Sequence, residues 1–332
     1  MRPNLKIGLV GAGWAARQHC KSLKVIGGAD VVAVFDVDPV SRDSLAAELQ
    51  AVPVWTLDDL LVADVDAVIV STPSGTHHES VVPALQRNKA VFVEKPVSRG
   101  ILDAWEIVKA AESSETICAV GYQWRALDDL LSINENLQGS VPASIVSQGV
   151  GITQARSWFN DDKLSGGLIF ERVSHHIDLQ RMIAGEVVSV SAVRGGVALS
   201  GRVNPADTEN DILSLILRFQ CGSIGVIVVG WAPEEYPPMQ FLNLHTTRSS
   251  FDLLLDPDFI LTDRSGKIGS QKASEHPFQR QMRSFLEATH TRDQSLVHCS
   301  ARDAAGTVAV ALAAAASLDN SGEYQTVPRH PA

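Results

Sequence analysis

A glycine-rich turn near the amino terminus constrains the fold more than any other part of this sequence. The apolar strand Leu5–Val10 runs directly into GAGWAA at residues 11–16, and a helical stretch follows. In this G-x-G-x-x-A pattern, Gly11 permits a tight turn, Gly13 lets a pyrophosphate approach the backbone, and the small Ala16 lets helix and strand pack closely. The free amides at the start of the helix face such phosphates. The pattern predicts a βαβ unit with four candidate dinucleotide contacts: Gly11, Gly13, Trp14 and Ala15.

The end of the next strand indicates which dinucleotide would bind. The strand over 31–35 ends on Asp36, about 20 residues after the glycines, where a carboxylate accepts hydrogen bonds from ribose hydroxyls. The same charge repels the 2′-phosphate of NADP, and no arginine follows Asp36 directly. The sequence therefore predicts NAD in preference to NADP. A structural βαβ unit without a ligand is the alternative.

Further strand–helix pairs continue this unit to about residue 121. The strand over 67–70 ends in the turn-forming STPSGTH, and the buried strand over 91–93 ends on EKP at 94–96. In open α/β sheets, ligands bind beyond the carboxyl ends of the strands. An exposed Glu–Lys pair of little energetic weight is the alternative for this second strand end. The candidate contacts at this edge are Ser71, Thr72, Pro73, His77, Glu94 and Lys95.

The alternation of strands and helices stops after residue 121. Strands dominate from residue 187 to residue 255, with a hairpin turn at 220–223, as is typical of an antiparallel sheet. The predicted fold class is α/β, with an N-terminal doubly wound Rossmann domain over 1–121. An α+β domain with a large, mostly antiparallel open sheet follows over 122–332. Helices in this second part are predicted over 127–137, 168–184, 276–288 and 301–318.

The long helix over 168–184 carries an acid–histidine–acid stripe on one face. Glu171, His175 and Asp178 are offset by four and three residues. A carboxylate one turn from a histidine orients its ring and stabilises its cation, which suits proton transfer. Two other interpretations remain: a solvated helix face with ion pairs, and a metal site that adds His176, although neighbouring residues on a helix point in different directions.

Composition excludes several classes of partner. The net charge is −10 and no lysine- or arginine-rich block occurs, which argues against nucleic acid and anionic membranes. The most apolar stretch, Ala304–Leu318, is short for a membrane span, and the chain enters a strand without a signal peptide. We therefore expect a cytoplasmic protein without a metal, in line with its four scattered cysteines: Cys20, Cys118, Cys221 and Cys299.

Five motifs together resemble the Gfo/Idh/MocA family of glucose–fructose oxidoreductases and inositol dehydrogenases. The resemblance implies a Rossmann domain followed by an α/β domain whose open sheet often forms homodimer or homotetramer contacts. Most of the family has Asp where Glu171 stands and Gly where Val173 stands. This chain is closer to a subgroup with Glu there and Ser or Thr before the histidine. The motifs are GAGWAA at 11–16, STPSGTHHE at 71–79, EKP at 94–96, GYQWR at 121–125 and SGGLIFERVSHHIDLQRMIAG at 165–185.

The resemblance also implies a reaction, namely hydride transfer between a secondary hydroxyl of a sugar or cyclitol and NAD. Lys95 would be the catalytic lysine that holds the alkoxide, His175 the base, and Glu171 its orienting partner or a substrate contact. Two alternatives are an NAD-retaining enzyme that cleaves glycosides through transient oxidation and a non-catalytic dinucleotide-dependent sensor. The further expected contacts are Gln123 with the cofactor, and Tyr122, Arg125, Arg156, Trp158 and Asp178 with the substrate.

Overall fold

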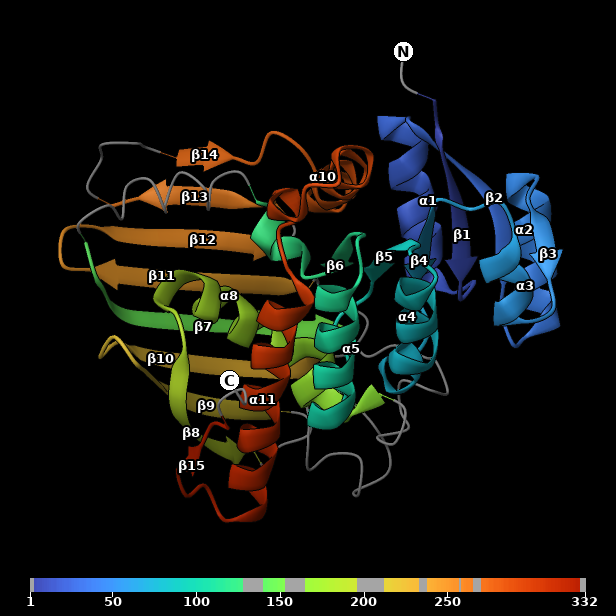
Figure 1. Ribbon diagram of the computed structural model, residues 1–332. Helices are drawn as coiled ribbons and strands as arrows, with labels where there is room; N and C mark the ends of the chain where they lie inside the picture. Colours follow the sequence, from blue (N-terminus) through green and yellow to red (C-terminus); the bar gives the residue numbers. More distant parts are fainter. Residues whose placement is uncertain are drawn as a thin grey trace. The chain divides into compact units, whose positions relative to one another are not determined.

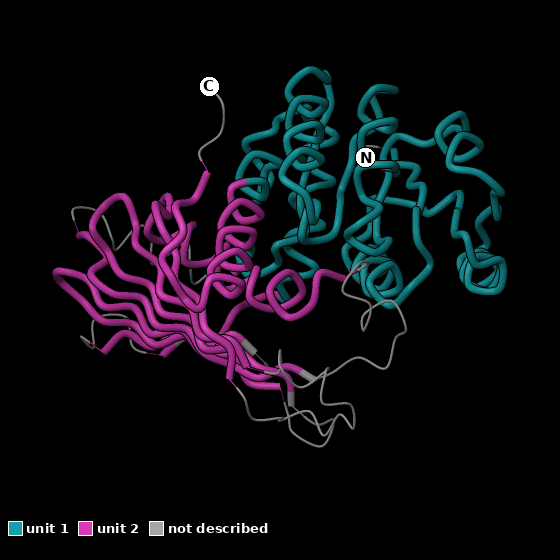
Figure 2. The backbone as a smooth tube through the Cα atoms, turned by 90° about the horizontal axis from the view of Figure 1, so that it is seen from below, with its two compact units in different colours: residues 1–126, 276–305 teal, residues 127–275, 306–332 magenta. Residues whose placement is uncertain are grey.

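The computed structural model describes residues 3–127, 140–152, 165–195, 212–232, 238–256, 258–264 and 270–328. The chain divides into two compact units, each of which combines two segments (Figure 2). Unit 1 contains residues 1–126 and 276–305, and unit 2 contains residues 127–275 and 306–332.

Unit 1 is built on a six-stranded sheet in the order β3-β2-β1-β4-β5-β6 (Figure 1). All five strand pairs are parallel, which confirms the predicted doubly wound sheet. The strand order reverses between β1 and β4, the point at which such sheets bind ligands. The strands are β1 (Leu5–Val10), β2 (Ala29–Phe35), β3 (Val52–Val54), β4 (Ala67–Val70), β5 (Ala90–Val93) and β6 (Cys118–Val120). The helices between them are α1 (Trp14–Ile26), α2 (Pro39–Leu49), α3 (Leu57–Val62), α4 (His77–Gln86) and α5 (Ile101–Ser113), with short 3-10 turns η1 (Ser74–Thr76) and η2 (Gln123–Ala126).

Short polar side chains begin two of these helices, as their sequences predict. Asp38 caps α2 by accepting from the backbone amides of Val40 and Ser41, with Pro39 in the first turn. Thr56 and Asp59 form a reciprocal capping box at the start of α3. These local contacts place the amino ends of both helices at the carboxyl edge of the sheet.

The structure divides the chain differently from the predicted boundary at residue 121. Helix α10 (Pro277–Thr291) and the 3-10 turn η5 (Gln294–Leu296) belong to unit 1. Met282, Phe285 and Leu286 of α10 are buried in the same core cluster as β1 and β5, and the rings of Phe285 and Phe92 lie 5.6 Å apart. An amphipathic pattern shows that a helix has a buried face but not which sheet that face covers, so the sequence assigned α10 to the second domain.

Unit 2 is built on a mixed sheet in which the described residues form nine strands, in the order β14-β13-β12-β11-β7-β10-β9-β8-β15. Among the described strand pairs of this unit 2 sheet, only the pair of β7 and β10 is parallel. This confirms the predicted, mostly antiparallel sheet. The predicted helix over 127–137 lies almost wholly outside the described residues. The strands are β7 (Pro142–Ile152), β8 (Val187–Arg194), β9 (Ile212–Phe219), β10 (Ile224–Ala232), β11 (Met239–Thr246), β12 (Ser250–Asp256), β13 (Ile260–Asp263), β14 (Ser270–Lys272) and β15 (Gln325–Thr326).

The predicted helix over 168–184 begins with a π-helical turn, η4 (Ile169–Val173), and continues as α8 (Ser174–Ala184). Its polar residues Arg172, His176 and Gln180, spaced by four, form one stripe. A Cβ at Gly151 of β7 would overlap Arg172, and one at Gly225 of β10 would overlap Gln180. Because these two glycines have no side chain, the helix formed by η4 and α8 lies close to the sheet (Figure 1).

Helix α11 (Ala301–Asp319) confirms the predicted final helix. A capping box begins it, in which the Asp303 amide donates to Ser300 Oγ at 3.1 Å and the Ser300 amide to Asp303 Oδ2 at 3.2 Å. Among the described residues, α11 alone is long and apolar enough to cross a membrane by length and composition, but 61% of its most apolar window is buried inside the protein. Such burial is usual for a core helix.

Candidate active site

The turn between β1 and α1 lies against the loop that follows β4. Gly11 has φ of +94°, and a Cβ at this position would lie 2.8 Å from the carbonyl carbon and oxygen of Ser71. Backbone of this kind favours glycine, and the close approach leaves no room for a side chain. Gly11 is therefore required by the fold of unit 1 itself.

Gly13 differs from Gly11 in both respects. Its φ is −76°, which any residue adopts, and a Cβ at this position would meet nothing within 4 Å. The protein itself therefore sets no requirement for glycine at residue 13. The open space over an exposed backbone at the start of α1 fits a group that approaches from outside, as a pyrophosphate does.

This contrast gives a prediction about two neighbouring glycines. Gly13→Val is expected to leave the melting temperature nearly unchanged and to weaken dinucleotide binding at least about tenfold, because the branched side chain occupies the space over the helix start. Gly11→Val is expected to destabilise the fold instead. Differential scanning fluorimetry and titration calorimetry with NAD separate the two effects. Unchanged NAD affinity in Gly13→Val would contradict a pyrophosphate position here.

Asp36 is held against the same turn. Its Oδ2 accepts from the amide of Ala12 at 2.6 Å, and its Oδ1 accepts from the amide of Asp38 at 2.8 Å. Each carboxylate oxygen has a second lone pair, so both can still accept from a diol. Nearby, Trp14 is 52% exposed and meets the ring of Phe278 edge-on at 6.3 Å.

Three buried hydroxyl oxygens have no hydrogen-bond partner within the described residues at the carboxyl end of β4. They belong to Ser71, Thr72 and Ser74. Buried polar atoms in folded proteins are nearly always paired, so a group of unpaired ones at a ligand edge indicates a missing partner. Ser71 and Thr72 were predicted contacts, whereas Ser74 was missed because only burial in η1 distinguishes it from other turn residues.

His77 joins the loops that follow β4 and β5. Its Nδ1 lies 3.0 Å from the carbonyl oxygen of Pro96 and its Nε2 lies 2.9 Å from that of Thr72. Burial lowers the pKa of His77, against the opposing effect of these carbonyl oxygens and of the Glu94 charge. Since both ring nitrogens face the backbone, His77 supports the edge on which cofactor contacts are predicted.

Glu94 and Lys95 follow β5, and the Lys95–Pro96 peptide bond is cis. Glu94 Oε1 lies 2.7 Å from Nε2 of His19, a fully buried residue of α1 that the sequence analysis did not single out. Burial alone would raise the pKa of the Glu94 carboxyl, but the hydrogen bond and charge of His19, with the charge of Lys95, hold it below its usual value. Glu94 is therefore an ionised group beside Lys95.

The residues after β6 are largely buried within unit 1. Tyr122 is 2% exposed, and Arg125 is 8% exposed with its Nη1 3.6 Å from Asp303 Oδ2. Gln123 is half-buried in η2. The predicted contacts of Tyr122 and Arg125 with a substrate, and of Gln123 with the cofactor, stay predictions.

The stripe on the unit 2 helix is not a solvated face. Glu171 is 8% exposed within the π-helical turn, a rare geometry that often marks functional sites. Asp178 is 2% exposed and accepts from Thr307 Oγ1 of α11 at 3.0 Å, and Thr307 in turn accepts from Arg181. The burial of Asp178 in this polar cluster does not support its predicted contact with substrate, whereas His175 is half-exposed.

His176 faces the sheet instead of sharing the position of His175. Its Nε2 lies 2.9 Å from Gln240 Oε1, and burial lowers its pKa to about 4. In the part of the chain that the structure describes, no three His, Cys, Asp or Glu side chains are grouped for a metal ion. The predicted contacts Arg156 and Trp158 lie outside the described residues.

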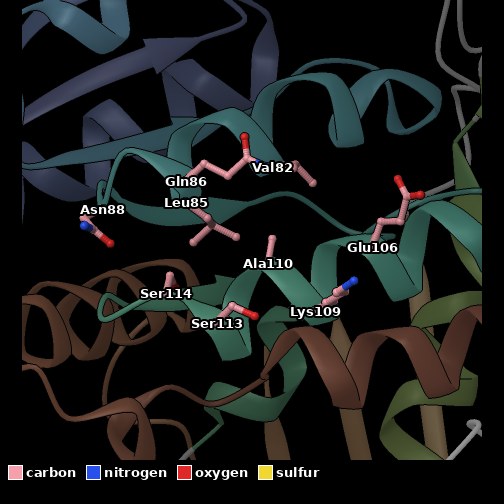
Figure 3. Close-up of a pocket in the computed structure, with 9 residues that line it drawn as sticks. All are labelled: Val82, Leu85, Gln86, Asn88, Glu106, Lys109, Ala110, Ser113 and Ser114. Atoms are coloured by element: carbon pink, nitrogen blue, oxygen red, sulfur yellow. The ribbon is translucent and has the colours of Figure 1, made fainter.

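A cavity of unit 1 is lined by residues of α4, α5 and the segments that follow them (Figure 3). It has a volume of about 370 Å³ and lies between α4 and α5. Asn88 and Ser114 line it and precede the amino ends of β5 and β6, opposite to the edge that carries Lys95. The cavity is therefore separate from the candidate site.

Comparison with known proteins covers most of the chain. The model described as "Oxidoreductase family, NAD-binding Rossmann fold" matches residues 5–122, and that of the "GFO/IDH/MocA C-terminal domain" matches residues 136–251. The chain is 28% identical to 2,7-anhydro-N-acetylneuraminate hydratase of Escherichia coli over 80% of this chain and 71% of that protein. It is 25% identical to myo-inositol 2-dehydrogenase of Thermotoga maritima over 80% of this chain and 81% of that protein.

Solved structures show the same fold at lower sequence identity. Levoglucosan dehydrogenase in complex with NADH and L-sorbose matches with a TM-score of 0.83 and 17% identity, covering 99% of this chain and all of that one. A putative myo-inositol dehydrogenase of Sinorhizobium meliloti matches with a TM-score of 0.80 and 20% identity, covering 98% of this chain and 100% of that one. At these identities the likeness supports the fold alone.

Proposed function

Because this chain belongs to the Gfo/Idh/MocA family of NAD-binding oxidoreductases, we propose that it oxidises a secondary hydroxyl of a sugar or cyclitol with NAD⁺ as the hydride acceptor. The proposal rests on the residues at the carboxyl edge of the unit 1 sheet. Open space over Gly13 and three unpartnered hydroxyls lie in the same unit as Lys95. These features fit a nicotinamide dinucleotide, which would supply the redox chemistry when bound.

The proposal assigns the pyrophosphate to the turn at Gly13 and the adenosine ribose to Asp36. The hydroxyls of Ser71, Thr72 and Ser74 would donate to or accept from the cofactor at the end of β4. Relatives support sugar-like substrates through their names: one acts on myo-inositol, and a solved structure contains L-sorbose. The substrate of this chain is a proposal by analogy with them.

Two side chains would handle the proton and the developing negative charge. His175 would remove the hydroxyl proton as a general base, oriented by Glu171 one turn earlier. Lys95 would hold the alkoxide by a charge-assisted hydrogen bond. The ionised carboxylate of Glu94 lies next to Lys95 in the chain, and its second oxygen accepts from the Lys95 amide at 3.2 Å.

An absorbance screen at the NADH band tests the proposal. The full-length protein is incubated with a panel of sugars and inositols, with NAD and NADP side by side. NADH formation with at least one polyol is the expected result. Tight NAD binding without NADH formation from any polyol would instead indicate a dinucleotide-dependent sensor.

The E. coli relative favours a second candidate function. Its name describes a hydratase, a reaction without net oxidation. In such an enzyme a sugar carbon would give up a hydride to a retained cofactor, water would be eliminated or added while the carbon is oxidised, and the hydride would then be returned to the carbon. Glycoside cleavage would proceed in the same way. Product analysis by mass spectrometry on anhydro sugars and glycosides, with no net NADH, would identify this reaction.

The choice of NAD over NADP gives a prediction at Asp36. Asp36→Ser is expected to raise the Kd for NAD about tenfold and to lower that for NADP, because it removes both a ribose acceptor and a charge that repels the 2′-phosphate. Calorimetric titration of the wild-type and variant proteins measures both. Equal affinity of the wild type for NAD and NADP would contradict the assignment.

The uncovered face of the unit 2 sheet supports a homodimer or homotetramer. Its alternating positions expose apolar side chains on three neighbouring strands, which monomers rarely leave in contact with water. Ile216→Glu at its centre is expected to reduce the molar mass measured by light scattering, whereas Leu102→Glu on the exposed face of α5 is not. A monomeric wild type would contradict an oligomer. The exposed residues are Val193, Ile216, Ile224 and Val228.

We further propose a cytoplasmic location. All four cysteines of the chain are free, and two of them are buried. Burial raises the pKa of Cys20 to about 11 and that of Cys118 to about 12, so neither is a reactive thiolate. Free thiols are typical of a reducing compartment.

A further inference from the structure

A buried pair of polar side chains lies behind Lys95. Nε2 of His19 is 2.7 Å from Glu94 Oε1, and the other carboxylate oxygen accepts from the amide of Lys95 at 3.2 Å. Since an ionised carboxylate only accepts, Nε2 is the ring nitrogen that carries the proton. The pair therefore joins α1 to the turn that carries Lys95.

Apolar groups enclose the rest of the His19 ring. Phe92 of β5 lies edge-on at 5.0 Å and Phe278 of α10 lies at 5.5 Å. The ring is fully buried, and its Nδ1 has no partner within the described residues. Burying a polar pair in such surroundings costs free energy, and apolar replacements of similar volume are often neutral or stabilising. Stability alone therefore does not account for His19.

Glu94 is confined on a third side by Gly121, which follows β6. A Cβ at Gly121 would lie 3.3 Å from Glu94 Oε1. The carboxylate is thus held between α1, the end of β5 and the end of β6, all within unit 1. Gly13, where the dinucleotide phosphates are proposed to bind, is the N-cap of α1.

We propose that His19 is a positioning residue of the reaction: its Nε2–H orients the Glu94 carboxylate, which in turn fixes the turn that presents the Lys95 ammonium. This inference rests on the proposed function. The groups that face Glu94 within the described residues are His19 from α1, His77 from α4 and the adjacent Lys95. Of these, His19 makes the side-chain hydrogen bond that keeps the pKa of Glu94 low.

Three variants test this role. His19→Leu removes the donor, His19→Gln retains an N–H donor, and Leu23→Ala damages the core on the same helix without touching Glu94. In His19→Leu, kcat is expected to fall about tenfold while the KM for the polyol stays within about twofold, because one charge-assisted hydrogen bond that positions Lys95 is lost. In His19→Gln and in Leu23→Ala, kcat is expected to stay near the wild-type value.

A second readout does not depend on turnover. The rate at which acetic anhydride labels Lys95 at pH 8, measured by peptide mass spectrometry against Lys89, is expected to rise about two- to fivefold in His19→Leu, because the half-buried lysine becomes more accessible when Glu94 no longer fixes its turn. If the wild type oxidises no polyol, the proposed function fails and labelling alone decides this inference.

The inference is overturned if His19→Leu changes neither kcat nor the labelling rate, or if Leu23→Ala lowers kcat equally. Where His19→Leu does not fold, Glu94→Gln replaces it, since it keeps the side-chain volume and cannot ionise. Glu94→Gln is expected to lower kcat to a similar extent and to accelerate Lys95 labelling. A wild-type kcat together with a wild-type labelling rate in Glu94→Gln contradicts the inference.

Discussion

Replacing Lys95 with alanine is expected to reduce kcat about 10²- to 10³-fold while NAD binding stays nearly unchanged. Removing one preorganised donor to a developing oxyanion costs about this much in other enzymes. Lys95 is half-buried at the end of β5, and its backbone amide donates to the carboxylate of Glu94 at 3.2 Å. Steady-state kinetics on the substrate found in the polyol screen, with calorimetric titration of NAD, measure the two quantities separately.

Two further variants control for charge and for stability. Lys95→Arg keeps the positive charge but spreads it over a planar guanidinium group, which differs in shape from the compact ammonium of lysine. We therefore expect Lys95→Arg to be little more active than Lys95→Ala. Lys109→Ala removes an exposed lysine of α5 at the cavity of Figure 3 and is expected to retain full activity. Equal loss of turnover and NAD binding in Lys95→Ala would refute a purely chemical role.

The parts of the fold that follow from local patterns could be predicted from the sequence. The glycine turn and the strand–helix alternation of unit 1 depend on residues that are close in the chain. In each case the residue types allow few backbone conformations. The same holds for the end of the predicted helix over 168–184, where Gly185 has φ of +82°.

The parts that depend on distant contacts could not be predicted. Nothing near His19 in the sequence indicates that Glu94, 75 residues later, accepts a hydrogen bond from its ring. Helix α10 joins unit 1 through Phe285 and Met282, although residues 121–276 separate it from β6 in the chain. An amphipathic helix carries no signal for the sheet that it covers.

The candidate site shows the same division. The motif after β4 predicted Ser71 and Thr72, but only the three-dimensional environment distinguishes Ser74 and its buried hydroxyl. Conversely, helical spacing placed Asp178 with His175, whereas the structure buries it against Thr307. Periodicity identifies a shared face but not what that face meets.

Adjacent histidines on the unit 2 helix give the second large effect. His175→Asn is expected to lower kcat about 10²- to 10⁴-fold, because it removes a general base, while the melting temperature stays nearly unchanged. Small imidazoles are expected to restore part of the rate. Steady-state kinetics with and without added imidazole measure both effects, and full activity in His175→Asn would contradict the assignment of the base.

His176→Asn is the matched control, and its effect is expected on stability instead of chemistry. The wild-type His176 has a pKa of about 4 in the folded protein, against roughly 6.5 in the unfolded chain. Between these values the unfolded state binds more protons, so this residue makes the free energy of unfolding fall as pH drops from about 6.5 to 4, by roughly 3 kcal/mol. Urea unfolding across this pH range should show that the free energy of unfolding falls less steeply in His176→Asn than in the wild type. In His175→Asn the fall should equal that of the wild type. If instead His176→Asn abolishes turnover in folded protein, the separation of roles between the two histidines is wrong.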